Sequence, residues 1–241
     1  MVLAGQYLER SVVIDGLDAL YHRGSRGPPC VIASPHPAMG GSMTSPVVAE
    51  LAWALTRGGH ATLRFDYRGV ASSRGVSRHA AGSERVGDVS DEVEDLLKVA
   101  GHLLETTRAP SLCAIGYSFG AKVALEAAAD ARVSQLVLVA PPTVLADFSA
   151  LASLQKPFLV VCAHHDAYCD RAALPVPTSV IAHSDHFFQR GLTELGKTVA
   201  TFLRAGRTPL QIEPDEPLPE EHREVELPEG EGDLELDLDR K

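Results

Sequence analysis

The sequence predicts an α/β protein with a mostly parallel sheet of about eight strands and helices on both faces. Short apolar runs alternate along the chain with longer segments that have helical spacing, which is typical of strands joined by crossover helices. The later runs are almost continuous in Val, Ile and Leu, as expected for strands covered on both faces. With 241 residues, the chain is long enough to bury a substantial core.

The strands and helices follow from these runs. The first two runs, 12–16 and 17–22, adjoin at Gly16 and Leu17, so we expect an antiparallel hairpin at one edge of the sheet. Further strands are expected at 30–34, 61–66, 111–116, 133–140, 157–163 and 178–182. Helices are expected at 47–58 and 189–204, where apolar residues recur at helical spacing, at 86–106, which has acidic residues in its early turns, and at 118–129, which is rich in alanine.

The acidic balance of the chain is concentrated at its C-terminal end. The net charge is −10, but residues 205–241 hold 13 acidic and 4 basic residues, so residues 1–204 are nearly neutral. A near-neutral body argues against a nucleic-acid binder, which needs clustered Lys and Arg. We expect a catalytic domain at 1–204 and a disordered acidic tail at 205–241, because the proline-containing tail has too little apolar surface to offset the entropy of ordering. Alternating leucines at 234, 236 and 238 suggest that this tail could bind a protein partner as an added strand.

The ends and the cysteines predict a cytoplasmic protein. The sequence shows no signal peptide and no run of 18 apolar residues, so we expect no membrane association. Three of the four cysteines lie in apolar, strand-like runs, as buried free thiols do in a reducing compartment. Their spacing matches no common zinc site, so neither a metal nor another cofactor is expected; the nearest approach to a ligand cluster comprises Cys162, His164, His165, Cys169 and Asp170.

The strongest functional signal is the sequence GYSFG at 116–120. It follows a predicted strand directly and precedes a predicted helix, which is the context of a nucleophile elbow. In such a turn the serine, here Ser118, has a strained backbone, and its hydroxyl points away from the sheet edge. The glycines at 116 and 120 allow the helix to pack back onto the strand.

A serine nucleophile needs a base and an acid that orients the base, in the chain order Ser, acid, His for this kind of turn. Asp166 follows the seventh predicted strand and His186 follows the eighth, so we expect these two residues to complete a triad with Ser118. Asp170 and Asp147 remain alternatives for the acid, and His183 remains an alternative for the base.

Two backbone N–H groups should bind the oxyanion that forms during acyl transfer. We expect Phe119, the residue after the nucleophile, to supply one of them. The second should come from the loop SPHPAMGGS at 34–42. Because Pro37 has no N–H group, we expect the donor beyond it, with Ala38 as the first choice and Met39 as the second.

Five motifs in order resemble the α/β-hydrolase superfamily: SPHPAMGG, RFDYRGVASSRG at 64–75, GYSFG, AHHD at 163–166 and SDHFF at 184–188. The set is similar to small, capless bacterial serine hydrolases of the dienelactone-hydrolase-like and short-chain esterase types. The resemblance covers 7–204 and implies an eight-stranded sheet with a triad of Ser118, Asp166 and His186. One departure is Ala71, which replaces a glycine of the family pattern and puts only the local loop shape in doubt.

These observations predict a serine esterase or thioesterase that acts on a small or exposed acyl substrate. The sixteen residues between the sixth and seventh strands are too few for a lid domain, so the site should be open. The alternative is a non-catalytic hydrolase-fold module whose acidic tail binds a protein partner.

Overall fold

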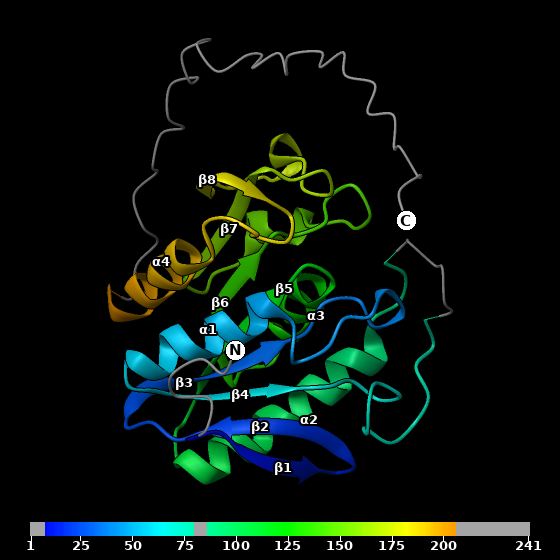
Figure 1. Cartoon of the computed structure of the whole chain (residues 1–241), viewed down its shortest axis with the longest axis vertical. Helices are drawn as coiled ribbons and strands as arrows, with labels where there is room; N and C mark the ends of the chain where they lie inside the picture. The colour runs from blue at the N-terminus through cyan, green and yellow to red at the C-terminus, as the bar shows by residue number, and fades with distance from the viewer. Residues whose placement is uncertain (1–7, 80–85, 206–241) are drawn as a thin grey trace, which may run out of the picture.

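The structure, a computed structural model, describes residues 8–79 and 86–205. Its eight strands form a sheet in the order β1-β2-β4-β3-β5-β6-β7-β8 (Figure 1). The strands are β1 (Arg10–Ile14), β2 (Leu17–His22), β3 (Arg26–Ala33), β4 (His60–Phe65), β5 (Leu112–Tyr117), β6 (Val133–Val139), β7 (Phe158–His165) and β8 (Ser179–Asp185). β2 pairs antiparallel with β1 and β4, and the strands from β4 to β8 run parallel. The predicted fold class and the edge hairpin are confirmed.

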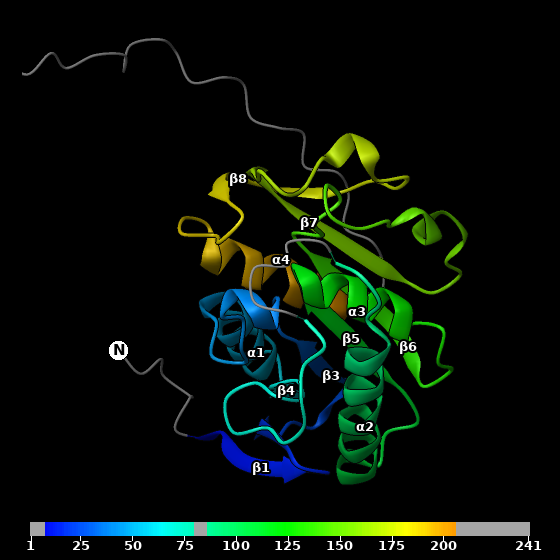
Figure 2. The same cartoon turned by 90° about the vertical axis from the view of Figure 1, so that its right-hand side faces the viewer.

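Four helices cover the two faces of the sheet. They are α1 (Pro46–Arg57), α2 (Ser90–Thr107), α3 (Phe119–Ala127) and α4 (Leu192–Ala205). α1 and α4 pack against each other on one face, and α2 and α3 pack on the other (Figures 1 and 2). The helix predicted from residue 86 begins at Ser90 instead, and in the local turn before it the Asp88 carboxylate accepts from the Ser90 N–H at 2.9 Å.

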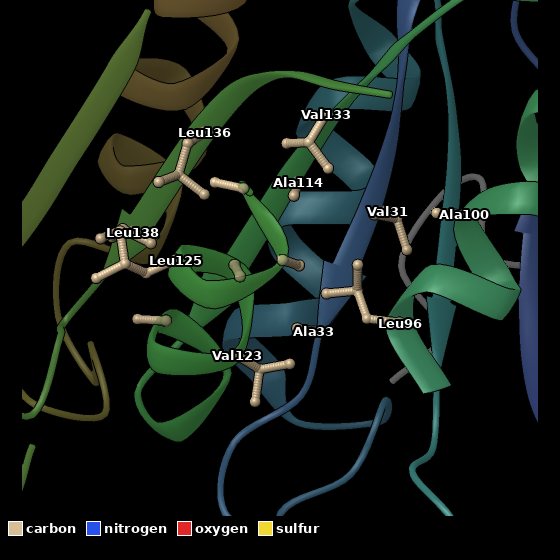
Figure 3. Close-up of a cluster of buried hydrophobic side chains, with 14 of the residues drawn as sticks. Val31, Ala33, Leu96, Ala100, Ala114, Val123, Leu125, Val133, Leu136 and Leu138 are labelled. Carbon is tan, nitrogen blue, oxygen red and sulfur yellow. The ribbon is translucent and has the colours of Figure 1, made fainter. Parts of the chain in front are cut away.

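The core consists of two layers, one on each side of the sheet. Figure 3 shows the layer in which Val31 of β3, Ala114 of β5 and Leu138 of β6 face α2 and α3. The second layer joins the opposite sheet face to α1 and α4. Because strand side chains alternate between the faces, the central strands must be apolar on both, which explains their continuous Val, Ile and Leu.

The loop after β4 is held by two separate contacts. The Asp66 carboxylate accepts from the Met43 N–H at 2.6 Å, and Arg68 forms an ion pair with Asp95 of α2 at 2.6 Å. Ala71 has a φ of 49°, so it adopts the left-handed backbone of the glycine expected at this position. Ala71 therefore adopts a backbone conformation that a glycine would adopt more easily.

The connection between β6 and β7 contains a 3₁₀ turn at Ser149–Ser153 and forms no lid domain. Phe148 and Leu151 of this connection are buried in the core. The predicted open site is consistent with this short path.

Two predictions concern features outside the folded core. The sequence predicts an acidic tail at 205–241. Ala205 is the last residue of α4, and the rest of the predicted tail, residues 206–241, lies outside the described residues. Within the described part of the chain, no helix combines the length and the hydropathy that crossing a bilayer requires.

α3 packs back onto β5 so closely that a side chain fits at neither glycine of the turn. A Cβ on Gly116 would overlap the carbonyl group of Gly120, and a Cβ on Gly120 would lie 2.5 Å from the Ala33 carbonyl oxygen. We therefore expect Gly116→Ala to lower the free energy of unfolding by about 3 kcal/mol in urea denaturation. The matched control is Gly101→Ala in α2, where the nearest atom to a Cβ is 3.5 Å away. This control should leave stability unchanged or raise it by up to about 1 kcal/mol; equal effects at the two sites would contradict the packing argument.

Candidate active site

Ser118 lies in the turn between β5 and α3, at the carboxyl edge of the sheet. Its backbone has φ 54° and ψ −120°, a region that residues other than glycine rarely occupy. The Ser118 N–H donates to the Val139 carbonyl at 2.9 Å, which ties the turn to the end of β6. Such strain persists only where the surrounding structure enforces it, and here it belongs to a strand-to-helix turn of the nucleophile-elbow type.

The structure brings Ser118, His186 and Asp166 into one hydrogen-bonded series. His186 Nε2 is 2.9 Å from Ser118 Oγ, and His186 Nδ1 is 2.8 and 2.9 Å from the two carboxylate oxygens of Asp166. A carboxylate only accepts, so Nδ1 carries a hydrogen and Nε2 is free to accept from the serine hydroxyl. The arrangement has the hydrogen-bond order that a Ser-His-Asp triad requires.

Asp166 follows β7 and is oriented by its own loop. Its side chain is fully buried, and Oδ1 accepts from the N–H groups of Tyr168 at 2.9 Å and Cys169 at 3.2 Å. The alternative acids lie elsewhere: Asp170 accepts from the Ala172 N–H, and Asp147 accepts from the backbone and hydroxyl of Ser149. Both alternatives cap local turns and do not contact His186.

The His186 ring lies among three aromatic rings. The ring centroids of Tyr117, Tyr168 and Phe187 lie 5.7, 4.8 and 5.5 Å from its own. The Tyr117 hydroxyl donates to the His186 carbonyl at 3.1 Å, and burial raises the pKa of Tyr117, so the hydroxyl keeps its proton. His183, the alternative base, is exposed on β8. Sequence reasoning missed Tyr117, although its position next to the nucleophile could have indicated a role.

A cavity of about 670 Å³ opens at Ser118 and His186. Its lining is mainly apolar and includes Met39, Val47, Leu145, Phe187 and Leu192. Among the described residues, no Lys, Arg, Asp or Glu lines this cavity. Met39 and Phe187 are both more than half exposed, so apolar side chains extend to the cavity mouth.

In the loop predicted to supply the second oxyanion donor, the N–H groups of Ala38 and Met39 already have acceptors. Residues Pro37–Met39 form a 3₁₀ turn, in which the Ala38 N–H donates to His36 Nδ1 at 3.2 Å and the Met39 N–H donates to the His36 carbonyl at 3.1 Å. Ala38 also does not line the cavity. Ala38 and Met39 are therefore poor donors, because their N–H groups are already bound within the loop.

The N–H groups of Phe119, next to Ser118 in the chain, and of His36, in the loop after β3, lie at the cavity. Phe119 is the first residue of α3, so its N–H has no carbonyl one turn earlier to bind. His36 lines the cavity, and within the described residues its N–H has no acceptor. The sequence-based prediction placed the second oxyanion donor after Pro37 and therefore did not consider His36, the residue immediately before Pro37.

The residues considered as zinc ligands form no such site. Within the described residues, no group of three or more His, Cys, Asp or Glu side chains is placed to hold a metal ion. All four cysteines are free and buried, and the Cys162 and Cys169 sulfurs lie 3.2 Å apart.

Comparison with known proteins identifies the family to which the chain belongs. Residues 38–154 match the family described as Serine aminopeptidase, S33. An alpha-beta serine hydrolase homologue from Coxiella burnetii is 30% identical with a TM-score of 0.68, and the match covers 80% of this chain and 97% of that one. The chain belongs to the α/β-hydrolase superfamily.

A protein from Xanthomonas campestris, which is described as a serine hydrolase without a lid, has a structure similar to that of this α/β hydrolase. That protein is 27% identical with a TM-score of 0.68, and the match covers 83% of this chain and 95% of that one. An uncharacterized protein of Rickettsia prowazekii is 25% identical, with 73% of this chain and 78% of that one covered. The fold is thus shared with a hydrolase that is described as lidless.

Acid should destabilise this α/β hydrolase through His36. Burial, together with the nearby imidazole of His79, lowers the pKa of His36 to about 4 from an ordinary value of 6.5. Between these two values the unfolded chain binds more protons than the folded one, so the free energy of unfolding falls as the pH drops.

We expect His36 to account for about 2 kcal/mol of the stability lost between about pH 7 and about pH 4.5. His36→Asn keeps an acceptor for the Ala38 N–H and removes the titration. Urea denaturation at both pH values should therefore show a smaller acid loss in the variant. Identical losses in the two proteins would contradict this assignment.

Proposed function

We propose that this hydrolase cleaves an ester or thioester of a small or exposed acyl substrate through an acyl-enzyme on Ser118. The observation that carries the proposal is the hydrogen-bonded series from Ser118 through His186 to the buried Asp166. The apolar cavity at this series supports a substrate whose acyl group is uncharged.

In the first half of the reaction, Ser118 Oγ attacks the substrate carbonyl carbon while His186 Nε2 takes the hydroxyl proton. Asp166 stabilises the imidazolium that forms and keeps Nδ1 protonated. The carbonyl oxygen becomes an oxyanion, for which we assign the N–H groups of Phe119 and His36 as donors. The imidazolium then protonates the departing alcohol or thiol as its bond to the acyl carbon breaks.

In the second half, water replaces the leaving group. His186 removes a proton from the water as its oxygen attacks the acyl carbon, and the same two N–H groups bind the second oxyanion. Collapse of this intermediate breaks the bond to Ser118 Oγ, which takes back a proton from His186. The products are a carboxylic acid and the free enzyme.

The cavity favours an uncharged acyl group over the free amino terminus that a substrate of an aminopeptidase, the activity in the family description, carries. An aminopeptidase must bind the protonated α-amino group of its substrate, and a buried ammonium without a partner is costly. No acidic side chain among the described residues lines the cavity to pair with that charge. An uncharged acyl group, in contrast, gains by burial against Met39, Leu145 and Phe187.

Replacement of the three proposed catalytic residues tests the mechanism directly. Wild type should react with a fluorophosphonate probe and hydrolyse a short-chain p-nitrophenyl ester, and Ser118→Ala should lose both reactions. Asp166→Asn should lower kcat by about 10⁴-fold, because the imidazole is then held in the wrong tautomer. The matched controls Asp170→Asn and Asp147→Asn should stay within about threefold of wild type. Ester turnover by folded Ser118→Ala at the wild-type rate would overturn the proposal.

A pair of esters tests the preference for uncharged acyl groups. The p-nitrophenyl esters of alanine and of N-acetylalanine share a leaving group and differ in the charge at the α-nitrogen. We expect kcat/KM to be at least about tenfold higher for the acetylated ester, measured below the pKa of the free amine. A preference for the free amine would instead favour an aminopeptidase.

A further inference from the structure

A cluster of three buried rings lies beside the two N–H groups assigned to the oxyanion. His36 comes from the loop after β3, Phe119 begins α3, and His79 comes from the segment before α2. The ring centroids are 4.7 Å apart for His36 and Phe119, 4.9 Å for His36 and His79, and 4.9 Å for His79 and Phe119. All three pairs meet edge to face, so each ring contacts the other two.

The loop holds the His36 ring in one orientation. Its Nδ1 accepts from the Ala38 N–H, so the neutral ring carries its hydrogen on Nε2. The same residue's carbonyl accepts from the N–H groups of Met39 and Gly41, which fixes its backbone. The ring and the backbone N–H of His36 therefore move together, and the same holds for Phe119 at the start of α3.

His79 is held against the other two rings by Glu92. Glu92 of α2 is 1% exposed, and within the described residues neither of its carboxylate oxygens has a hydrogen-bond partner. His79 Nε2 lies 3.4 Å from Glu92 Oε1, and the His79 side chain is 7% exposed. A buried carboxyl group needs a polar neighbour, and within the described residues the His79 imidazole is the one that lies beside it.

Tyr67 supports the cluster from another side. Its ring centroid is 5.9 Å from that of Phe119, and its hydroxyl donates to the Ser34 carbonyl at 3.2 Å, at the base of the His36 loop. Glu92 and Asp95 both raise the pKa of this fully buried tyrosine, after burial itself, so its hydroxyl stays protonated. Arg68 pairs with Asp95, whereas the carboxyl group of Glu92 lies beside His79.

We propose that His79 is a positioning residue: its ring, held by Glu92, packs against His36 and Phe119 and fixes the spacing of the two oxyanion N–H groups. The inference rests on the proposed function, since it concerns the oxyanion site of that reaction. His79 touches neither the nucleophile nor the substrate cavity, so its effect passes through the other two rings.

The expected signature is a loss in the chemical step with substrate binding preserved. The oxyanion exists only after Ser118 attacks, so a shifted N–H group weakens the transition state more than the bound ester. Loss of one oxyanion donor costs about 10²–10³ in kcat in other hydrolases, and a displaced donor should cost less. His79→Ala should therefore lower kcat by about 10-fold to 100-fold and leave KM within about threefold.

A trifluoromethyl ketone provides a second readout. Ser118 Oγ adds to its carbonyl carbon, the hydroxyl proton passes to His186, and the resulting alkoxide occupies the oxyanion site. We expect His79→Ala to weaken this inhibitor by about the same factor as it lowers kcat. A purely structural role for His79 would lower the melting temperature without this parallel change.

The double variant His79→Phe/Glu92→Met tests the ring itself. It keeps an aromatic ring at position 79 and replaces both buried polar groups with apolar ones, a change that buried polar pairs often tolerate. We expect kcat within about threefold of wild type. The control His60→Asn removes a buried imidazole that hydrogen-bonds to the Pro28 carbonyl at 2.9 Å, at the opposite end of the parallel strands. It should lower stability and leave kcat unchanged.

The outcomes separate this inference from the proposed function. If wild type neither reacts with a fluorophosphonate nor turns over p-nitrophenyl esters, the proposed function fails. If wild type is active and folded His79→Ala keeps kcat within about twofold, or loses kcat without weaker binding of the trifluoromethyl ketone, the positioning role is wrong. Failure of the double variant to recover kcat would also overturn it.

Discussion

The close approach of α3 to β5 determines where every part of the candidate site can lie. Without side chains at Gly116 and Gly120, the helix can begin directly after the strand, and Ser118 is forced into a left-handed backbone. That backbone directs the hydroxyl away from the sheet edge and leaves the Phe119 N–H at the helix start. The nucleophile and one oxyanion donor therefore depend on the same turn.

The remaining groups come from the loops after β3, β7 and β8. Because these strands run parallel to β5, their carboxyl ends meet at one edge, and residues distant in the sequence come within hydrogen-bond reach of Ser118. The rigid core on both sheet faces supports that edge. The positions of the polar groups at the site are thus maintained by the apolar packing beneath them. Backbone N–H groups orient Asp166, and the Tyr117 hydroxyl orients His186.

Sequence reasoning predicted most of the fold and the proximity of Ser118, Asp166 and His186. Strand and helix periodicity identified the order of the elements, and that order determines which loops meet at the carboxyl edge. The order does not reveal how a loop folds within itself. The turn at Pro37–Met39 binds the N–H groups of Ala38 and Met39, which no spacing argument detects.

Contacts between side chains that are distant in the sequence could not be predicted from the sequence either. His79 and Glu92 lie in a segment whose sequence predicts only a loop and a helix. The contacts of His79 with His36 and with Glu92 depend on how α2 packs on the sheet. The start of α2 at Ser90 also differs from the predicted start at residue 86, because the chain before Ser90 forms a local turn in which Asp88 accepts from the Ser90 N–H.

The short connection between β6 and β7 has a consequence for how the specificity of such a protein can change. Its 3₁₀ turn is anchored in the core by Phe148 and Leu151, while Leu145 reaches the cavity. The entropic cost of closing a loop rises only slowly with its length. Residues added to the connection between β6 and β7 therefore leave the sheet and the Ser118 turn intact. New binding surface can therefore be added here by insertion alone, without a change to any residue that carries the chemistry.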